Sequence, residues 1–124
     1  MMQDRIRNAA LRQRIMTAAE AAALIEDGMV VGMSGFTRAG EAMAVPLALA
    51  ERAKQAPLQI TLATGASLGN DIDSILAAGG VTARRMPFQS DPGLRRAINA
   101  GEVMFIDQHL SETVEQMRRG QIAP

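Results

Sequence analysis

The 124-residue sequence contains no cysteine, no tryptophan and no tyrosine, and it has a single histidine. The absence of cysteine excludes a disulfide framework, a thiolate zinc site and a cysteine nucleophile, and it is consistent with a cytoplasmic protein. One histidine without an adjacent carboxylate cluster gives no metal-ligand spacing, so no metal site is expected. The first 15 residues mix charges and are not typical of a signal peptide. No apolar run approaches the ~20 residues of a membrane span.

The sequence also lacks a net charge, because 13 basic residues balance 13 acidic ones. This balance gives no electrostatic reason to expect nucleic acid or a membrane surface as a partner. Three arginine pairs could suggest a polyanion patch, but they are spread along the chain: Arg84-Arg85, Arg95-Arg96 and Arg118-Arg119. We interpret them as solvated helix faces and strand ends. Nine methionines and many alanines are expected to fill a core that has few aromatic residues.

Apolar spacing and turn residues predict two helices followed by alternating strands and helices. The first two helices are expected at 4–15 and 18–27, the second with a capping box at Thr17–Glu20. Strands are expected at 29–35, 58–64, 81–88 and 102–107. The helices between and after them are expected at 46–55, 70–80, 91–101 and 111–120, with Asn70, Asp91 and Ser111 as the caps of the last three.

This alternation predicts an α/β fold with a parallel sheet and helical crossovers. We treat residues 1–124 as one unit. The sequence stops after a predicted helix, where another strand would be expected. It therefore looks like an incomplete N-terminal part of a domain, although a complete four-strand unit is not excluded.

The first predicted strand is followed by a glycine-rich loop at 32–40. Gly35 and Gly40 have the spacing of a phosphate-binding P-loop, but Glu41 and Ala42 stand where that loop needs Lys and Ser or Thr. These two residues argue against a nucleotide P-loop, because an acidic side chain there would repel a phosphate. Two interpretations remain: a tight turn that needs glycine at positive φ, or a loop whose backbone approaches a ligand at the carboxyl end of the sheet.

The second strand is followed by Gly65-Ala-Ser-Leu-Gly69, which has the G-x-S-x-G spacing of a nucleophile elbow. One interpretation is a serine hydrolase, with Ser67 as nucleophile and Asp91 and His109 completing a triad. The other is a strand-to-helix turn in which Ser67 binds the first helical amides. The short chain and the early strand position favour the second. His109, in Asp107-Gln-His-Leu110, is more often a structural residue than a catalyst.

In order and spacing, six segments resemble the acetyl-CoA hydrolase / succinyl-CoA:acetate CoA-transferase family. They are Asp4–Asn8, Val30–Gly40, Thr64–Ser67, Pro87-Phe88, Ile98–Gly101 and Asp107–Leu110. The chain is also similar to the broader class I CoA-transferase signature at Asp27-Gly28, with Ser34-Gly35-Phe36 in place of a Gly-Gly-Phe. The resemblance implies two α/β CoA-transferase domains, of which this chain would be the N-terminal part.

In this family a glutamate of the second domain attacks an acyl-CoA, and a glutamyl-CoA thioester then transfers CoA to a carboxylate or is hydrolysed. The resemblance therefore implies no catalytic residue in this chain, which alone would be inactive, and coenzyme A as a substrate rather than a permanent cofactor. The implied partners are acyl-CoA, a small carboxylate and the missing C-terminal domain, with a homo-oligomer left open.

The resemblance implies a substrate-binding role for eight residues: Gly35, Phe36, Thr37, Gly40, Gly65, Ala66, Ser67 and His109. Ser67 would lie beside the carboxylate nucleophile and donate to it. Arg38 departs from the small residue that is usual at its position. Two alternatives remain beside this one: the serine hydrolase, and a non-enzymatic fragment that binds CoA or a partner chain.

Overall fold

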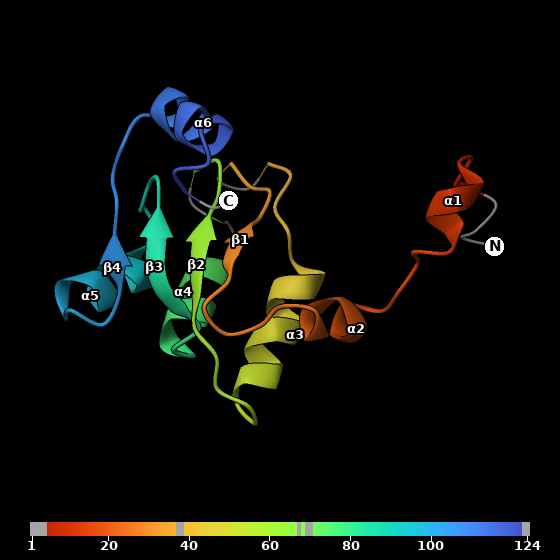
Figure 1. Ribbon diagram of the computed structural model, residues 1–124. Helices are drawn as coiled ribbons and strands as arrows, with labels where there is room; N and C mark the ends of the chain where they lie inside the picture. Colours follow the sequence, from red (N-terminus) through yellow and green to blue (C-terminus); the bar gives the residue numbers. More distant parts are fainter. Residues whose placement is uncertain (1–4, 37–38, 67, 69–70, 123–124) are drawn as a thin grey trace.

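The computed structural model describes residues 5–36, 39–66, 68 and 71–122, which form an α/β arrangement (Figure 1). Four parallel strands lie in the order β1-β2-β3-β4. The strands are β1 Val30–Gly32, β2 Ile60–Ala63, β3 Thr82–Met86 and β4 Met104–Phe105. The helices are α1 Ala9–Arg12, α2 Ala18–Ala23, α3 Ala44–Ala53, α4 Ile72–Ala78, α5 Pro92–Asn99 and α6 Leu110–Arg118. The predicted fold class is confirmed.

The crossover helices α3, α4 and α5 lie together behind the sheet in Figure 1. This follows from the strand order, because right-handed crossovers between successive neighbouring strands place every helix on the same face. The main core lies between this helical layer and the sheet, and its largest fully buried side chains are Leu49, Ile60, Leu62, Ile72 and Leu76. Helix α6 lies instead above the carboxyl ends of the strands (Figure 1).

The first two helices are shorter than predicted. Helix α1 covers only 9–12 of the expected 4–15, and none of its residues is buried. A helix this short gains little without tertiary packing. Helix α2 has the predicted capping box, but it ends at Ala23 rather than near residue 27. Arg52 explains this end, since its Nη1 donates to the backbone oxygens of Ala22 and Ile25 at 2.8 and 2.6 Å.

The later helices match the sequence prediction more closely. Asp91 caps α5 as predicted, by accepting a hydrogen bond from the Leu94 amide at 2.7 Å. The predicted cap Ser111 of α6 is wrong, because the helix begins at Leu110 and His109 is its N-cap. The predicted cap Asn70 lies outside the described residues. Within the described part of the chain, no helix is long and apolar enough to cross a membrane.

Candidate functional site

The loop that follows β1 closes on itself. The Ser34 hydroxyl donates to the Gly40 carbonyl at 2.7 Å, and the Ala42 amide donates to the Ser34 carbonyl at 3.1 Å. Between them, Phe36 and Ala39 form an antiparallel bridge. Gly40 has a φ of 63°, a conformation that glycine adopts without steric cost. The tight-turn interpretation of this loop is therefore confirmed.

The loops after β1 and β2 are in direct backbone contact. The Ala66 amide donates to the Gly35 carbonyl at 3.1 Å. A Cβ added at Gly65 would lie 2.8 Å from that same carbonyl oxygen, closer than real Cβ contacts allow. Gly65 is therefore needed because the two loops approach so closely. A Cβ added at Gly35 would lie 2.7 Å from Cδ2 of Leu68. That atom is the end of a flexible side chain.

A cavity of about 320 Å³ opens where these loops meet the segments after β3 and β4. Its lining comprises Phe36, Gly65, Ala66, Phe88, Gln108, His109 and Leu110. Four of the eight predicted site residues therefore line one cavity, although they lie up to 73 positions apart in the sequence. The cavity lies at the carboxyl end of a parallel sheet, where such folds bind ligands.

The other predicted site residues divide into two groups. Gly35 and Gly40 are described, but neither lines the cavity; Gly35 supports it through the hydrogen bond to Ala66. Thr37 and Ser67 lie outside the described residues, as does Arg38. Sequence reasoning did not assign Phe88 or Gln108 to the site. Both follow the end of a strand, and that position in a parallel sheet was the available signal.

His109 has a structural role in α6 as well as a place in the cavity. Its Nδ1 accepts a hydrogen bond from the Ser111 amide at 3.3 Å and lies 2.7 Å from the Ser111 hydroxyl. Gln108, immediately before it, donates through Nε2 to the hydroxyl of Thr113 at 2.8 Å. These contacts hold the segment after β4 against the first turns of α6. The ring of His109 is thereby held at the cavity.

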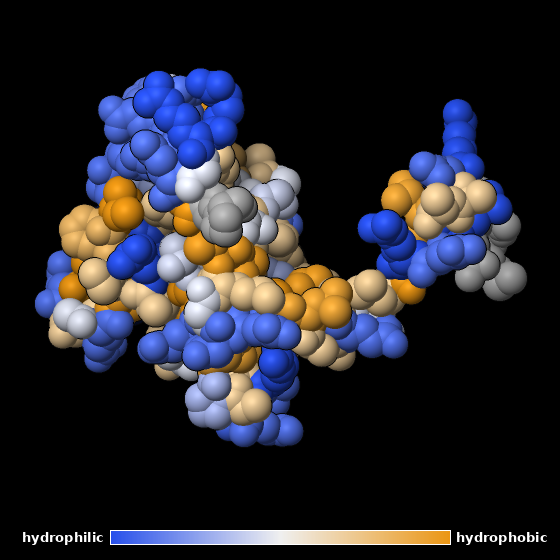
Figure 2. Space-filling model, in the orientation of Figure 1, coloured by the Kyte–Doolittle hydropathy of each residue, from blue (hydrophilic) through white to orange (hydrophobic). Residues whose placement is uncertain are grey.

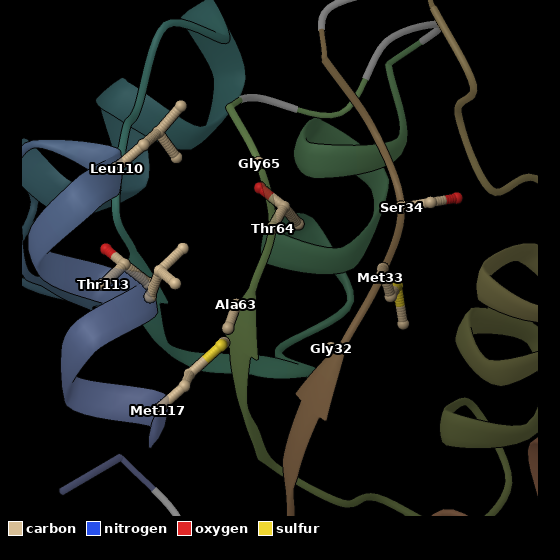
Figure 3. Close-up of a pocket in the computed structure, with 10 residues that line it drawn as sticks. Gly32, Met33, Ser34, Ala63, Thr64, Gly65, Leu110, Thr113 and Met117 are labelled. Atoms are coloured by element: carbon tan, nitrogen blue, oxygen red, sulfur yellow. The ribbon is translucent and has the colours of Figure 1, made fainter. Parts of the chain in front are cut away.

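Helix α6 faces a second hollow, also of about 320 Å³, above β1 and β2 (Figure 3). Ala63, Thr64 and Gly65 lie on one side of it, and Leu110, Thr113 and Met117 line the other side. In Figure 3 the side chain of Met117 points toward Ala63. The residues on both sides are mainly small or apolar, so this hollow offers few polar groups to a ligand.

A buried ion pair lies beneath the loop that follows β2. Arg85 and Asp73 are 0% and 1% exposed, and Nε of Arg85 lies 2.8 Å from Oδ1 of Asp73. The interpretation of the arginine pairs as solvated is therefore wrong for Arg85, although its neighbour Arg84 is exposed. Consecutive residues of a strand point to opposite faces, so one of the two had to point toward the helical layer.

Two further observations bear on what this site could bind. In the described ranges, no group of three His, Cys, Asp or Glu side chains could hold a metal ion. Asp91, the acid of the alternative triad, accepts hydrogen bonds from the Ser74 hydroxyl at 2.6 Å and from the Leu94 amide. These are the contacts of a helix cap between α4 and α5.

Comparison with known proteins identifies the family. Residues 1–123 match the model of the acetyl-CoA hydrolase/transferase N-terminal domain. The chain belongs to this family. It is 41% identical to a succinyl-CoA:acetate CoA-transferase of Clostridium kluyveri over 91% of this chain, and 43% identical to a propanoyl-CoA:succinate CoA transferase of Escherichia coli over 85%. An acetyl-CoA hydrolase of Kluyveromyces lactis is 33% identical over 97% of the chain.

The acetyl-CoA hydrolase/transferase relatives are much longer than this chain. It spans 21%, 22% and 24% of the three relatives named above. Two of these relatives are CoA-transferases and the third is an acetyl-CoA hydrolase. The resemblance inferred from the sequence motifs is therefore confirmed, and the family is one of enzymes that act on CoA thioesters.

Proposed function

We propose that this chain forms one wall of the site at which an acyl-CoA exchanges its CoA with a small carboxylate or with water. The cavity lined by Phe36, Gly65, Ala66 and His109 carries this proposal, because residues from separate loops converge there at the carboxyl end of the sheet. Residues 1–124 would act as the N-terminal part of a CoA-transferase domain. The cytoplasmic location expected from the sequence stays a prediction.

The covalent chemistry in this proposal belongs to a glutamate outside the chain. Its carboxylate oxygen attacks the thioester carbonyl carbon, and the C–S bond breaks to release CoA thiolate and leave an acyl-glutamyl anhydride. The thiolate then attacks the glutamyl carbonyl, which releases the free acid and leaves a glutamyl-CoA thioester. An acceptor carboxylate reverses these steps to form the new acyl-CoA. Water instead hydrolyses the glutamyl-CoA thioester and releases CoA.

The chain itself would bind and orient the reacting groups. Ser67, between Ala66 and Leu68, would donate its hydroxyl to the attacking carboxylate. The small residues Gly65 and Ala66 would let the acyl group approach the backbone, and the exposed rings of Phe36 and Phe88 would contact its apolar part. Gly35, Thr37 and Gly40 would contribute by shaping the loop that presents Phe36. None of these residues forms a covalent bond with substrate.

The first test compares the isolated chain with the same residues placed in a full-length transferase. Purified alone, the chain should not turn over acetyl-CoA with succinate or water. A hybrid in which residues 1–124 replace the matching segment of the Clostridium kluyveri transferase should transfer CoA from succinyl-CoA to acetate. Turnover by the chain alone, or a hybrid that folds like its parent but transfers no CoA, would contradict the proposal.

The second test addresses the serine hydrolase alternative. A fluorophosphonate probe should leave the chain unlabelled, because Ser67 in our proposal is a donor rather than a nucleophile. Labelling that disappears in Ser67→Ala would establish the hydrolase instead. The third alternative, a fragment that binds CoA without catalysis, predicts that CoA binds the chain but that the hybrid stays inactive.

A further inference from the structure

The buried pair of Arg85 and Asp73 has more contacts than an ion pair requires. Besides Asp73, the guanidinium donates through Nη2 to the Thr64 hydroxyl at 2.8 Å and to the Ala66 carbonyl at 2.9 Å. It also donates through Nη1 to the carbonyl of Met86. Arginine suits this place because its planar guanidinium presents several donors in a fixed geometry.

Asp73, the other member of the ion pair, also binds the backbone of this loop. Its Oδ2 accepts a hydrogen bond from the Leu68 amide at 2.7 Å. The Ala66 carbonyl and the Leu68 amide belong to the two peptide bonds that flank residue 67. The ion pair therefore holds both chain neighbours of Ser67, one through the guanidinium and one through the carboxylate.

Stability alone does not account for such a pair. Two charges removed from water lose their hydration, and replacing a buried ion pair by apolar side chains of similar volume is often neutral or stabilising. What apolar side chains could not do is bind the Ala66 carbonyl and the Leu68 amide. The contacts that distinguish this pair from an apolar alternative are those to the loop.

We propose that Arg85 and Asp73 are positioning residues for the loop at 64–68. They fix the spacing between Ala66 and Leu68, the two neighbours of Ser67 in the chain, and the surface that Gly65 and Ala66 present to the cavity. This inference rests on the proposed function, in which Ser67 donates to the attacking carboxylate. Neither charged side chain lines the cavity, so they would act through the loop rather than on substrate.

The test compares four variants. Arg85→Met removes the donors and leaves Asp73 buried without its partner. Arg85→Met with Asp73→Leu removes both charges, so that folding is retained while the loop contacts are lost. Arg85→Lys keeps the charge, but an ammonium cannot donate to Asp73, Thr64 and Ala66 with the guanidinium's geometry. Arg52→Met is the control, because Arg52 is half-buried and also donates to backbone carbonyls, but to those of Ala22 and Ile25, far from the loop at 64–68 in the sequence.

The first measurement is amide hydrogen exchange by NMR on the chain itself, which does not depend on CoA chemistry. The amides compared are those of Leu68 and of Ile60, which donates to the Val81 carbonyl within the core. In the double variant, protection of Leu68 should fall roughly tenfold more than that of Ile60, because a local contact is lost. In Arg52→Met the protection of the Leu68 amide and that of the Ile60 amide should fall by the same factor. Equal losses in the double variant would overturn the inference.

The second measurement is steady-state kinetics of the hybrid transferase. The double variant should lose about 10²-fold in kcat, with the KM for acyl-CoA within threefold, because a displaced donor impairs reaction more than binding. Arg85→Lys should recover only part of this loss, and Arg52→Met should keep the wild-type kcat. A double variant with wild-type kcat would overturn the inference and leave the proposed function standing. If the unmutated hybrid transfers no CoA, the proposed function fails and the exchange experiment alone decides the positioning role.

Discussion

At the scale of single residues, the close contact between the two glycine-rich loops requires glycine at position 65. The Gly65→Ala substitution would place a methyl group 2.8 Å from the Gly35 carbonyl oxygen, an atom of the backbone that cannot rotate away. We expect it to lower the free energy of unfolding by about 1–3 kcal/mol, as overpacking does elsewhere. Urea denaturation followed by circular dichroism measures the change.

Gly32→Ala is the control for this substitution. Gly32 lies in β1, and no atom lies within 4 Å of the position its Cβ would occupy. The unfolding free energy of the Gly32→Ala variant should stay within about 0.5 kcal/mol of the wild-type value. If the two substitutions had equal effects, the close approach of the loops would not be the reason for glycine at 65.

Glu20 gives a prediction about pH. Hydrogen bonds from the backbone amide of Thr17 and then from its hydroxyl hold the pKa of Glu20 below its ordinary value of 4.5. A carboxylate with a lowered pKa stabilises the fold above its unfolded pKa, and that stabilisation is lost as the pH falls through the folded value. Wild type should therefore be more stable than Glu20→Gln at pH 7, and the difference should shrink as the pH falls below about 4.5.

Thermal unfolding at a series of pH values measures this effect. In a Thr17→Ala background the pH dependence should be smaller but still present, because the backbone amide of residue 17 remains as a donor. A difference between wild type and Glu20→Gln that is constant from pH 7 to pH 3 would contradict the assigned role of the capping box.

At the scale of elements, helices α4 and α5 pack more closely than any sequence pattern indicated. A Cβ at Gly93 would lie 2.1 Å from the Ser74 hydroxyl oxygen and 3.2 Å from the Ser74 Cα. Gly93→Ala should therefore destabilise the chain by about 1–3 kcal/mol, even though alanine favours helix formation. Restoring space with Ser74→Gly should recover part of that loss. Additive effects in this double-mutant cycle would exclude the contact as the cause.

The elements that the sequence predicted correctly are those with local signals. The capping box at Thr17 and the aspartate-proline pair at the start of α5 act within one helical turn, so they can be recognised without a structure. The end of α2 could not be predicted, because Arg52 determines it from about 30 positions away. The start of α6 was missed for a different reason: His109 accepts the capping hydrogen bond that serine was expected to accept.

The candidate site divides in the same way. Glycine-rich loops after predicted strands indicated where a ligand could bind, and three residues named in them, Phe36, Gly65 and Ala66, do line one cavity together with His109. The buried ion pair of Arg85 and Asp73, which binds the loop at 64–68, was not predicted. Sequence composition suggested that Arg85 was solvated, whereas its contacts to Asp73 and Ala66 exist only once β3 lies beside β2.

At the scale of the whole molecule, hydrophobic surface is exposed beside the sheet. Figure 2 shows a hydrophilic outer surface on α6 and hydrophobic patches below it. Within β4, Met104 and Phe105 are 63% and 53% exposed, and this strand forms an edge of the described sheet. An exposed apolar edge strand can pair with another chain.

We therefore expect the isolated chain to self-associate as its concentration rises, which sedimentation velocity would measure. Phe105→Lys should reduce association, because a charged side chain opposes edge-to-edge pairing. Leu24→Lys is the control, since Leu24 is 65% exposed but lies at the end of α2, away from the sheet edge. If both substitutions reduced association equally, general hydrophobicity rather than the β4 edge would be responsible. A chain that stays monomeric at every concentration would show that this edge does not promote pairing.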